Sequence, residues 1–164
     1  MLDTDWIVLL SAAALAFSVM NYVLLDGTDL GVGVLMGLTR CGKDRRAMAV
    51  TILPIWDANE TWLVLGGGGL LALFPLAYAI LLPALILRAV AFEFRDYAPS
   101  DGFKRVVDGL LLCGSLLAGG TQGIVLGTLV QGVPNHAGQY SGDGAEWLNA
   151  FPLFCGAVLV VGYT

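Results

Sequence analysis

The sequence has little charge, one histidine, and no lysine or arginine after Arg105. Only 13% of its 164 residues are charged, and 13 acidic against 8 basic residues give a net charge of -5. A protein that binds nucleic acid presents a basic surface to the phosphates, so this balance excludes nucleic acid as a partner. The cysteines, Cys41, Cys113 and Cys155, are far apart and match no disulfide framework or zinc-site spacing.

Hydrophobic residues dominate instead, at 57% of the chain with a mean hydropathy of +0.80. This exceeds the apolar content of an ordinary soluble domain. Four stretches carry no charged residue: 6–25, 61–87, 109–142 and 147–164. Because a helix needs about 20 residues to cross about 30 Å of hydrocarbon, the sequence predicts an all-α, polytopic transmembrane helix bundle.

The two ends of the chain allow two further expectations. Asp3 and Asp5 stand where a cleaved signal sequence needs positive charge, so the first apolar stretch is expected to remain in the mature protein. The last apolar stretch is at the short limit for a span, so it is expected to be a truncated helix.

The basic residues form two clusters, which short cytoplasmic loops would carry. The clusters are Arg40, Lys43, Arg45 and Arg46, and then Arg88, Arg95, Lys104 and Arg105. The N-terminus and residues 131–147 would then face outside. Two cytoplasmic clusters require an even number of crossings between them, yet the uncharged stretch 61–87 is too short for two.

Three structures would resolve this conflict: a re-entrant hairpin turning near Pro75 or Pro83, a second crossing that extends into residues 88–94, or a helix that lacks part of its length. Proline favours a turn or kink because it lacks the backbone donor that a helix interior needs. The expected spans of this single transmembrane domain are about 6–38, 61–82, a shortened 83–95, 106–131 and a truncated 148–164.

Two carboxylates, Asp26 and Asp29, lie in the first of these spans at a spacing that places them on one helix face. A carboxylate inside a membrane is costly unless it is paired, protonated or facing water, so both are candidate functional residues. The alternative is that the helix ends there and both are solvated. The nearby Gly27, Gly31 and Gly33 favour close approach of a neighbouring helix.

A second polar cluster, Trp56, Asp57, Asn59, Glu60 and Trp62, precedes the second span. Asp57 and Glu60 are again three residues apart, and facing the first pair they would form a line of sites for proton relay. The simpler interpretation is that Asp57 and Glu60 form a helix-capping box and the tryptophans an interfacial belt.

Other polar residues have structural interpretations. Glu93 is expected to pair with Arg88 or Arg95 at the inner surface, Gln122 to form an interhelical hydrogen bond, and His136 to be solvent-exposed. A single histidine and no Cys-x-x-Cys-His motif give this chain no set of haem ligands. Glycines 66–69 are expected to allow close helix packing rather than to bind phosphate.

Several motifs in order resemble subunit II of cytochrome bd-type ubiquinol oxidases. They are residues 22–33 (YVLLDGTDLGVG), 56–63 (WDANETWL), 66–69 (GGGG), 74–79 (FPLAYA), 92–95 (FEFR) and 129–134 (LVQGVP). The resemblance covers essentially the whole chain. It implies the first four-helix bundle of a longer subunit and the start of the next helix, with an apparent internal deletion in the third helix between Leu85 and Arg88. Thr28 stands where the family usually has an aromatic residue.

The resemblance also implies a function. The chain would be a subunit, not catalytic alone, of a bacterial inner-membrane enzyme that oxidises ubiquinol and reduces dioxygen to water. Subunit I and possibly a small accessory subunit would be its partners in the lipid bilayer, and subunit I would hold the haems. Asp26, Asp29, Asp57 and Glu60 would supply protons, with Trp56, Asn59 and Trp62 shaping the site. The alternatives are a small ion or solute transporter or channel, and a non-functional fragment.

Overall fold

The computed structural model describes residues 2–73, 75–132, 134–136, 139–142 and 145–164. Within these ranges almost the whole chain is helical: α1 (Leu2–Leu38), α2 (Gly42–Ile52), α3 (Trp56–Leu73), α4 (Pro75–Phe94), α5 (Asp101–Gln131) and α6 (Ala150–Tyr163). Between α5 and α6, the two-residue strands β1 (Asn135–His136) and β2 (Gln139–Tyr140) pair antiparallel, and η1 (Ala145–Leu148) is a short 3-10 helix. The prediction of an all-α helix bundle is confirmed.

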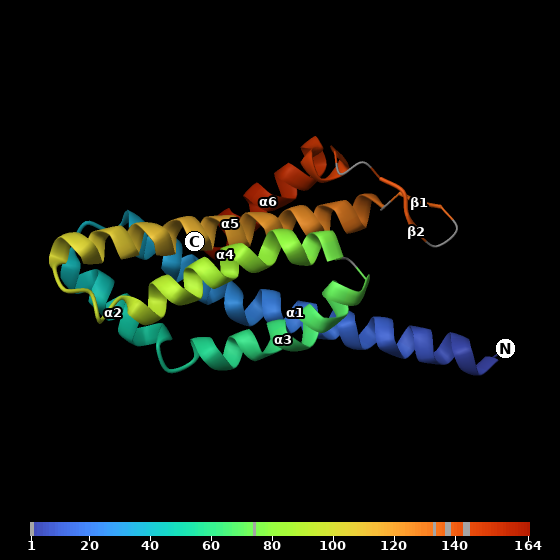
Figure 1. The fold of residues 1–164 in the computed structure, drawn as a ribbon, viewed down its shortest axis with the longest axis horizontal. Helices are drawn as coiled ribbons and strands as arrows, with labels where there is room; N and C mark the ends of the chain where they lie inside the picture. Colours follow the sequence, from blue (N-terminus) through green and yellow to red (C-terminus); the bar gives the residue numbers. More distant parts are fainter. Residues whose placement is uncertain (1, 74, 133, 137–138, 143–144) are drawn as a thin grey trace.

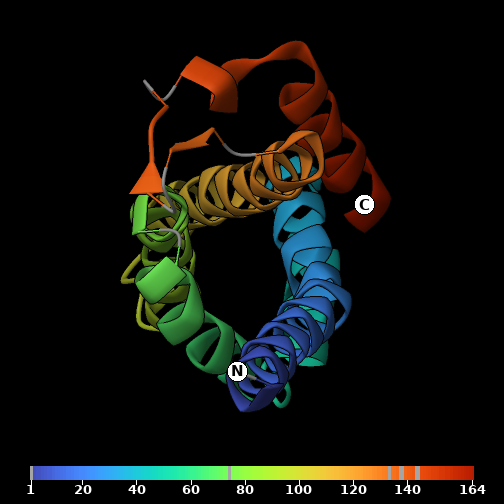
Figure 2. The ribbon, with the colours of Figure 1, turned by 90° about the vertical axis from the view of Figure 1, so that its right-hand side faces the viewer.

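The long helices run roughly along one axis of the molecule (Figures 1 and 2). Helix α5 packs against α1, α4 and α6, and α1 also packs against α3. Helix α2 lies at one end of the bundle, and the β1–β2 ribbon lies at the other (Figure 1). This arrangement places residues far apart in sequence on facing helices in the middle of the bundle.

Two helices of the described chain are long and apolar enough to cross a membrane, Leu9–Leu38 within α1 and Asp101–Gln131, which is α5. Large apolar side chains cover much of the outer surface, among them Leu10, Leu24 and Val130. Lipid tails are as apolar as such side chains, so an apolar exterior is what a bilayer requires.

The stretch between the basic clusters forms two helices, α3 and α4, whose break lies next to Pro75 rather than at Pro83. Proline is tolerated at the first position of a helix, where no intrahelical donor is needed, and Pro75 takes that position. Helix α4 then continues through Pro83 and includes residues 88–94. The expected boundary between residues 82 and 83 is therefore wrong, and the second helix gains its length from the segment that contains Arg88.

Helix α1 passes without interruption through residues 26–29, in agreement with the expected span 6–38, so the alternative that the helix ends at the acidic pair is wrong. One other local expectation is revised. Residues 42–52, which the spans left between helices, form α2, whose Ala49 and Ile52 are buried against Met36 and Phe92. Burial of this narrow apolar side closes one end of the bundle.

Glycines on α1 allow the close helix approach that the sequence indicates. A Cβ atom at Gly27 would lie 2.3 Å from the ring of Tyr163, and one at Gly33 would lie 2.1 Å from the Ser115 hydroxyl. The glycine run on α3 differs. A Cβ at Gly67 would meet only Tyr78, at 3.7 Å, and Gly68 faces open space, so neither position requires glycine for packing.

Candidate functional site

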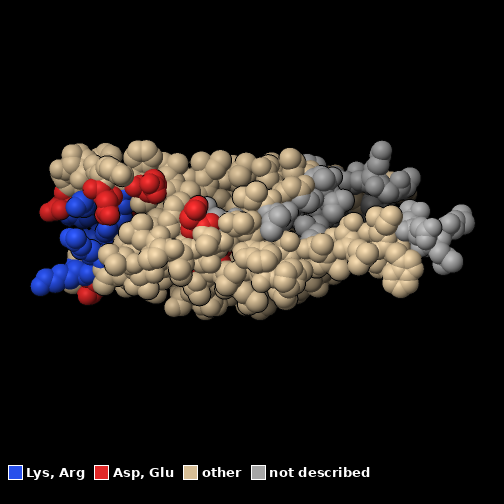
Figure 3. Space-filling model, turned by 90° about the horizontal axis from the view of Figure 1, so that it is seen from below, with Lys and Arg blue, Asp and Glu red and all other residues tan. Residues whose placement is uncertain are grey.

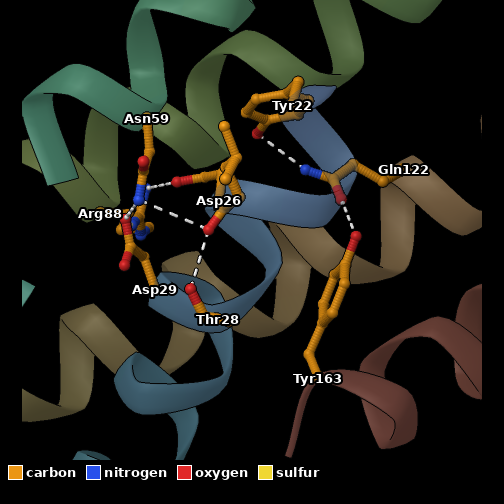
Figure 4. A network of polar contacts seen from close by, with 9 residues as sticks. Tyr22, Asp26, Thr28, Asp29, Asn59, Arg88, Gln122 and Tyr163 are labelled. Carbon is orange, nitrogen blue, oxygen red and sulfur yellow. Dashed lines mark hydrogen bonds and ion pairs between the residues drawn. The ribbon is translucent and has the colours of Figure 1, made fainter. Parts of the chain in front are cut away.

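The acidic pair of α1 lies in the interior of the bundle (Figure 4). Asp26 is 0% exposed and Asp29 is 1% exposed. Because residues three apart on a helix lie on the same side, the unbroken α1 presents both carboxylates to the same neighbours. Those neighbours are α3 and α4, so the site combines residues from three helices.

Arg88 of α4 is the positive charge of the site. Its Nη1 atom lies 3.1 Å from Oδ1 of Asp26, and its Nη2 atom lies 3.9 Å from Oδ2 of Asp29. The arginine is itself only 3% exposed. Pairing is what makes buried charges tolerable, and a guanidinium can reach two carboxylates at once.

The expected pairing of Glu93 with the arginines is not what the structure shows. Arg88 contacts the α1 pair, and the Nε atom of Arg95 donates to Asp108 at 2.6 Å, whereas Glu93 is exposed. The sequence interpretation counted Arg88 with the inner-surface cluster because it is the first of the four basic residues that follow the second apolar stretch. A signal was nevertheless present: Arg88 has no charged neighbour between Thr61 and Phe92, which is typical of an intramembrane arginine.

Asn59 of α3 completes the described contacts of the pair. Its Nδ2 atom donates to Oδ2 of Asp29 at 3.0 Å and lies 3.5 Å from the carbonyl oxygen of Leu25 (Figure 4). An amide donor holds a carboxylate in place without adding charge. Asn59, expected only to shape the site, therefore donates a hydrogen bond directly to Asp29.

Three oxygens of the pair accept no well-aligned hydrogen bond from the described residues: both of Asp26 and Oδ1 of Asp29. A buried acceptor without a donor is costly, so it is a place where a proton or a further donor is favourable. The arrangement combines two carboxylates with one shared guanidinium, in a region shielded from solvent. It can hold and exchange protons.

A second polar group adjoins the site. Nε2 of Gln122 donates to the Tyr22 hydroxyl at 2.7 Å, and the Tyr163 hydroxyl donates to Oε1 of Gln122 at 2.8 Å (Figure 4). These bonds connect α1, α5 and α6, so the interhelical role expected of Gln122 is confirmed. Tyr22 precedes Asp26 by one helical turn and was not singled out from the sequence.

The structure describes the second acidic cluster in part, and its Asp57 does not face the buried pair. Asp57 is the second residue of α3 and is exposed, so it is neither an N-cap nor a neighbour of the buried pair. Glu60 belongs to α3, but its side chain lies outside the described residues. Asp57 and Asn59 are two positions apart, and such residues do not share a helix face.

The tryptophans of this cluster are half-buried and pack against neighbouring helices. Trp56 packs edge-on against Phe92, with ring centroids 5.6 Å apart, and Trp62 does the same against Phe17 at 5.8 Å. These contacts join α3 to α4 and to α1. Both tryptophans fix the helix that carries Asn59.

The described part of the chain offers no metal centre. It contains no group of three or more His, Cys, Asp or Glu side chains arranged to hold a metal ion. His136 lies on β1 and is exposed, as expected. A lone exposed histidine at the end of the bundle does not fit an axial ligand of an enclosed haem.

Comparison with known proteins agrees with this geometry. Residues 7–164 match the family described as cytochrome bd terminal oxidase subunit II. The chain therefore belongs to the cytochrome bd oxidase subunit II family. The resemblance seen in the motifs is confirmed.

Relatives of this chain are found in several bacteria. The chain is 35% identical to the probable cytochrome oxidase subunit 2 of Haemophilus influenzae, over 93% of this chain and 44% of that protein. It is 32% identical to the cytochrome bd-I ubiquinol oxidase subunit 2 of Escherichia coli K12, over 85% and 41%. It is also 32% identical to the cytochrome bd ubiquinol oxidase subunit 2 of Bacillus subtilis, over 86% and 46%. The chain thus spans less than half the length of these relatives.

Proposed function

We propose that this chain acts within a membrane quinol oxidase as the part of subunit II that stores and supplies protons for the reduction of dioxygen. The relatives named as ubiquinol oxidase subunits support ubiquinol as the reductant of the complex. The buried pair Asp26 and Asp29 is the single observation that carries the proton role. Two carboxylates in a membrane interior are maintained against a substantial cost, which favours a functional reason for them.

The electrostatics of the pair support exchange rather than permanent pairing. One guanidinium faces two carboxylates among the described groups, and three carboxylate oxygens lack a well-aligned donor. These oxygens are the places where the pair can take up a proton. Arg88 and Asn59 position the two carboxylates during this exchange.

Asp57 enters the proposal at a different place. It is exposed on α3, close in sequence to the half-buried Asn59 that donates to Asp29. An exposed carboxylate within a membrane bundle is best accommodated against a partner protein or water. We therefore assign Asp57 to the surface where protons pass between this chain and its partner. Glu60, three residues later in the sequence, stays part of the proposed proton pathway.

The single histidine of the chain is exposed, and the described residues form no metal site, so we assign the haems of the oxidase to a partner subunit, namely subunit I. When bound there, they supply the electron transfer and the oxygen chemistry. Lipid surrounds the remaining apolar exterior, and a small accessory subunit can cover part of it. We place the complex in the bacterial inner membrane, with the N-terminus outside and the basic end of the bundle in the cytoplasm.

The test is oxygen consumption and proton uptake by the complete oxidase carrying Asp26→Asn. Asparagine keeps the size of aspartate but cannot take up a proton at neutral pH. We expect quinol-driven turnover to fall at least about tenfold, in the range that loss of a positioned acid or base costs. The haem spectrum and the recovery of the complex should remain those of the unmodified protein.

Asp44→Asn is the matched control, because Asp44 is an exposed carboxylate on α2, away from the pair. It should leave turnover unchanged. The proposal fails if Asp26→Asn retains full turnover and proton uptake while the complex assembles normally. Asp57→Asn separates the two assigned roles, because loss of turnover in this variant would show that the exposed carboxylate also carries protons.

A further inference from the structure

A cavity at the end of the bundle, far from the acidic pair in the direction of α2, collects most of the basic residues. Its volume is about 710 Å³, and α2, the end of α4 and the start of α5 line it. Six of its lining residues are basic and three are acidic: Arg40, Arg45, Arg46, Arg95, Lys104 and Arg105, with Asp96, Asp101 and Asp108. The lining therefore has an excess of positive charge, and Figure 3 shows lysine and arginine side chains gathered at this end.

Part of this charge is fixed in the wall of the cavity. Both oxygens of the buried Asp108 are occupied, one by Nη1 of Arg45 at 2.6 Å and the other by Nε of Arg95 at 2.6 Å. The Nε atom of Arg45 is buried and has no hydrogen-bond partner in the described residues. Two guanidiniums thus share one carboxylate, and a donor remains unsatisfied.

The remaining cations are free. No ion pair involves Arg40, Arg46, Lys104 or Arg105 in the part of the chain that the structure describes. Gly42, the first residue of α2, also lines the cavity, and its N-cap residue Cys41 makes no side-chain capping bond. A helix start with free backbone donors favours an anion.

The position of the cavity indicates which anion. It lies where the apolar stretch of α1 ends at Leu38 and that of α5 begins at Asp101, which is the depth of lipid headgroups. Ala49, Val50 and Leu53 form an apolar wall beside the cations, and Val50 is 59% exposed. Inorganic phosphate has no apolar part that could contact this wall, whereas a phospholipid can pack its glycerol and acyl chains against it.

We propose that this cavity binds the phosphate of an anionic phospholipid headgroup. Arg46 and Lys104 contact the phosphate, the wall of Arg45, Arg95 and Asp108 holds the cavity open, and the apolar side receives the start of the acyl chains. The lipid would join α2 to the beginning of α5. This site is separate from the acidic pair and does not depend on the proposed proton role.

The test is a titration of the detergent-purified protein, with the subunits that accompany it, followed by native mass spectrometry. The probes are phosphatidylglycerol, phosphatidylcholine and inorganic phosphate. The variant Arg46→Gln/Lys104→Gln removes two unpaired cations without touching the Asp108 network. At about 1 kcal/mol for each cation near a headgroup, each removal should weaken phosphatidylglycerol binding about fivefold, and both about thirtyfold.

Lys43→Gln is the matched control, because Lys43 lies on the same helix but does not line the cavity. It should bind phosphatidylglycerol as the unmodified protein does. If the double variant is not recovered from membranes, each single variant tests the site through its own fivefold loss.

Three results would overturn the proposal. Equal losses in Lys43→Gln and in the double variant would show a diffuse charge effect. Equal binding of phosphatidylcholine would show that the anionic charge is not recognised. Displacement of phosphatidylglycerol by equimolar inorganic phosphate would show a free-phosphate site and not a lipid site.

Discussion

At the scale of residues, the pair formed by Asp26 and Asp29 depends on a single arginine from another helix. Arg88 contacts both carboxylates and is itself buried. A buried ion pair adds little net stability to the folded protein. Removing one partner is nevertheless strongly destabilising, because the other charge then stays buried without a partner. The arginine therefore explains why α1 can remain helical through two acidic residues in its apolar stretch.

Replacing Arg88 with methionine should destabilise the protein by about 3–5 kcal/mol, because both carboxylates lose their counter-charge while remaining buried. Thermal unfolding of the detergent-purified complex measures this effect. Lys43→Met is the control, since Lys43 is an exposed cation that does not line the basic cavity and has no ion pair in the described chain. The double variant Asp26→Asn/Arg88→Met should recover part of the loss, because it removes one of the unpaired charges. Equal melting of Arg88→Met and Lys43→Met would contradict this account.

At the scale of elements, the α5–α6 contact depends on the absence of side chains. A Cβ atom at Gly123 would lie 2.5 Å from the carbonyl oxygen of Cys155 and 2.6 Å from the Cα atom of Gly156. Both are backbone atoms that no rotamer change can move. The two helices must separate to admit even a methyl group, and Gln122 holds them at this distance through Tyr163.

Gly123→Ala should therefore cost about 1–3 kcal/mol, the usual penalty of overpacking. Gly120→Ala on the same helix is a matched control, because a Cβ there meets nothing within 4 Å. This control should be neutral or slightly stabilising, since alanine favours helix more than glycine does. Thermal unfolding followed by tryptophan fluorescence distinguishes the two variants, and an unchanged midpoint for Gly123→Ala would show that α6 is not packed on α5 in this way.

The sequence predicts the helices better than it predicts what lies between them. The shared face of the acidic pair follows from spacing if the helix is continuous, because residues three apart lie on the same side of a helix. The continuity itself comes from the structure, since the sequence also allowed the helix to end at the pair. The break at Pro75 could not be chosen over Pro83, since local chemistry permits a proline at either place and only packing against α5 decides. The ion pair of Arg88 with the acidic residues was missed for the same reason, because the position of Arg88 along the bundle depends on where α4 begins.

The exposure of Asp57, in contrast to the buried Asp26 and Asp29, has another cause. Its spacing from Glu60 is the same as that of Asp26 from Asp29, but periodicity gives relative positions on one helix and not the direction in which that helix is rotated. The half-buried Trp56 and Trp62 fix the rotation of α3, which turns Asn59 inward and Asp57 outward. Tertiary packing supplies this information, and a single helix pattern does not contain it.

At the scale of the whole molecule, charge is distributed unevenly between the two ends of the bundle. The basic cavity lies at the α2 end, whereas residues 131–147 contain no lysine or arginine. Short loops rich in lysine and arginine remain in the cytoplasm. The structure places Cys41 at the basic end and His136 at the opposite end, and both are exposed, so each can report the side of the membrane on which it lies (Figure 1).

Two single-cysteine proteins test this orientation in intact cells treated with a membrane-impermeant maleimide. One retains Cys41 with Cys113→Ala and Cys155→Ala, and the other carries His136→Cys with all three natural cysteines replaced. We expect the His136→Cys protein to react directly and the Cys41 protein to react only after the inner membrane is opened, because the positive cluster keeps its end inside. Reaction of Cys41 in closed cells would show that the bundle has the opposite orientation in the membrane. The cavity would then face the outer leaflet, while the buried acidic pair and its contacts would be unchanged.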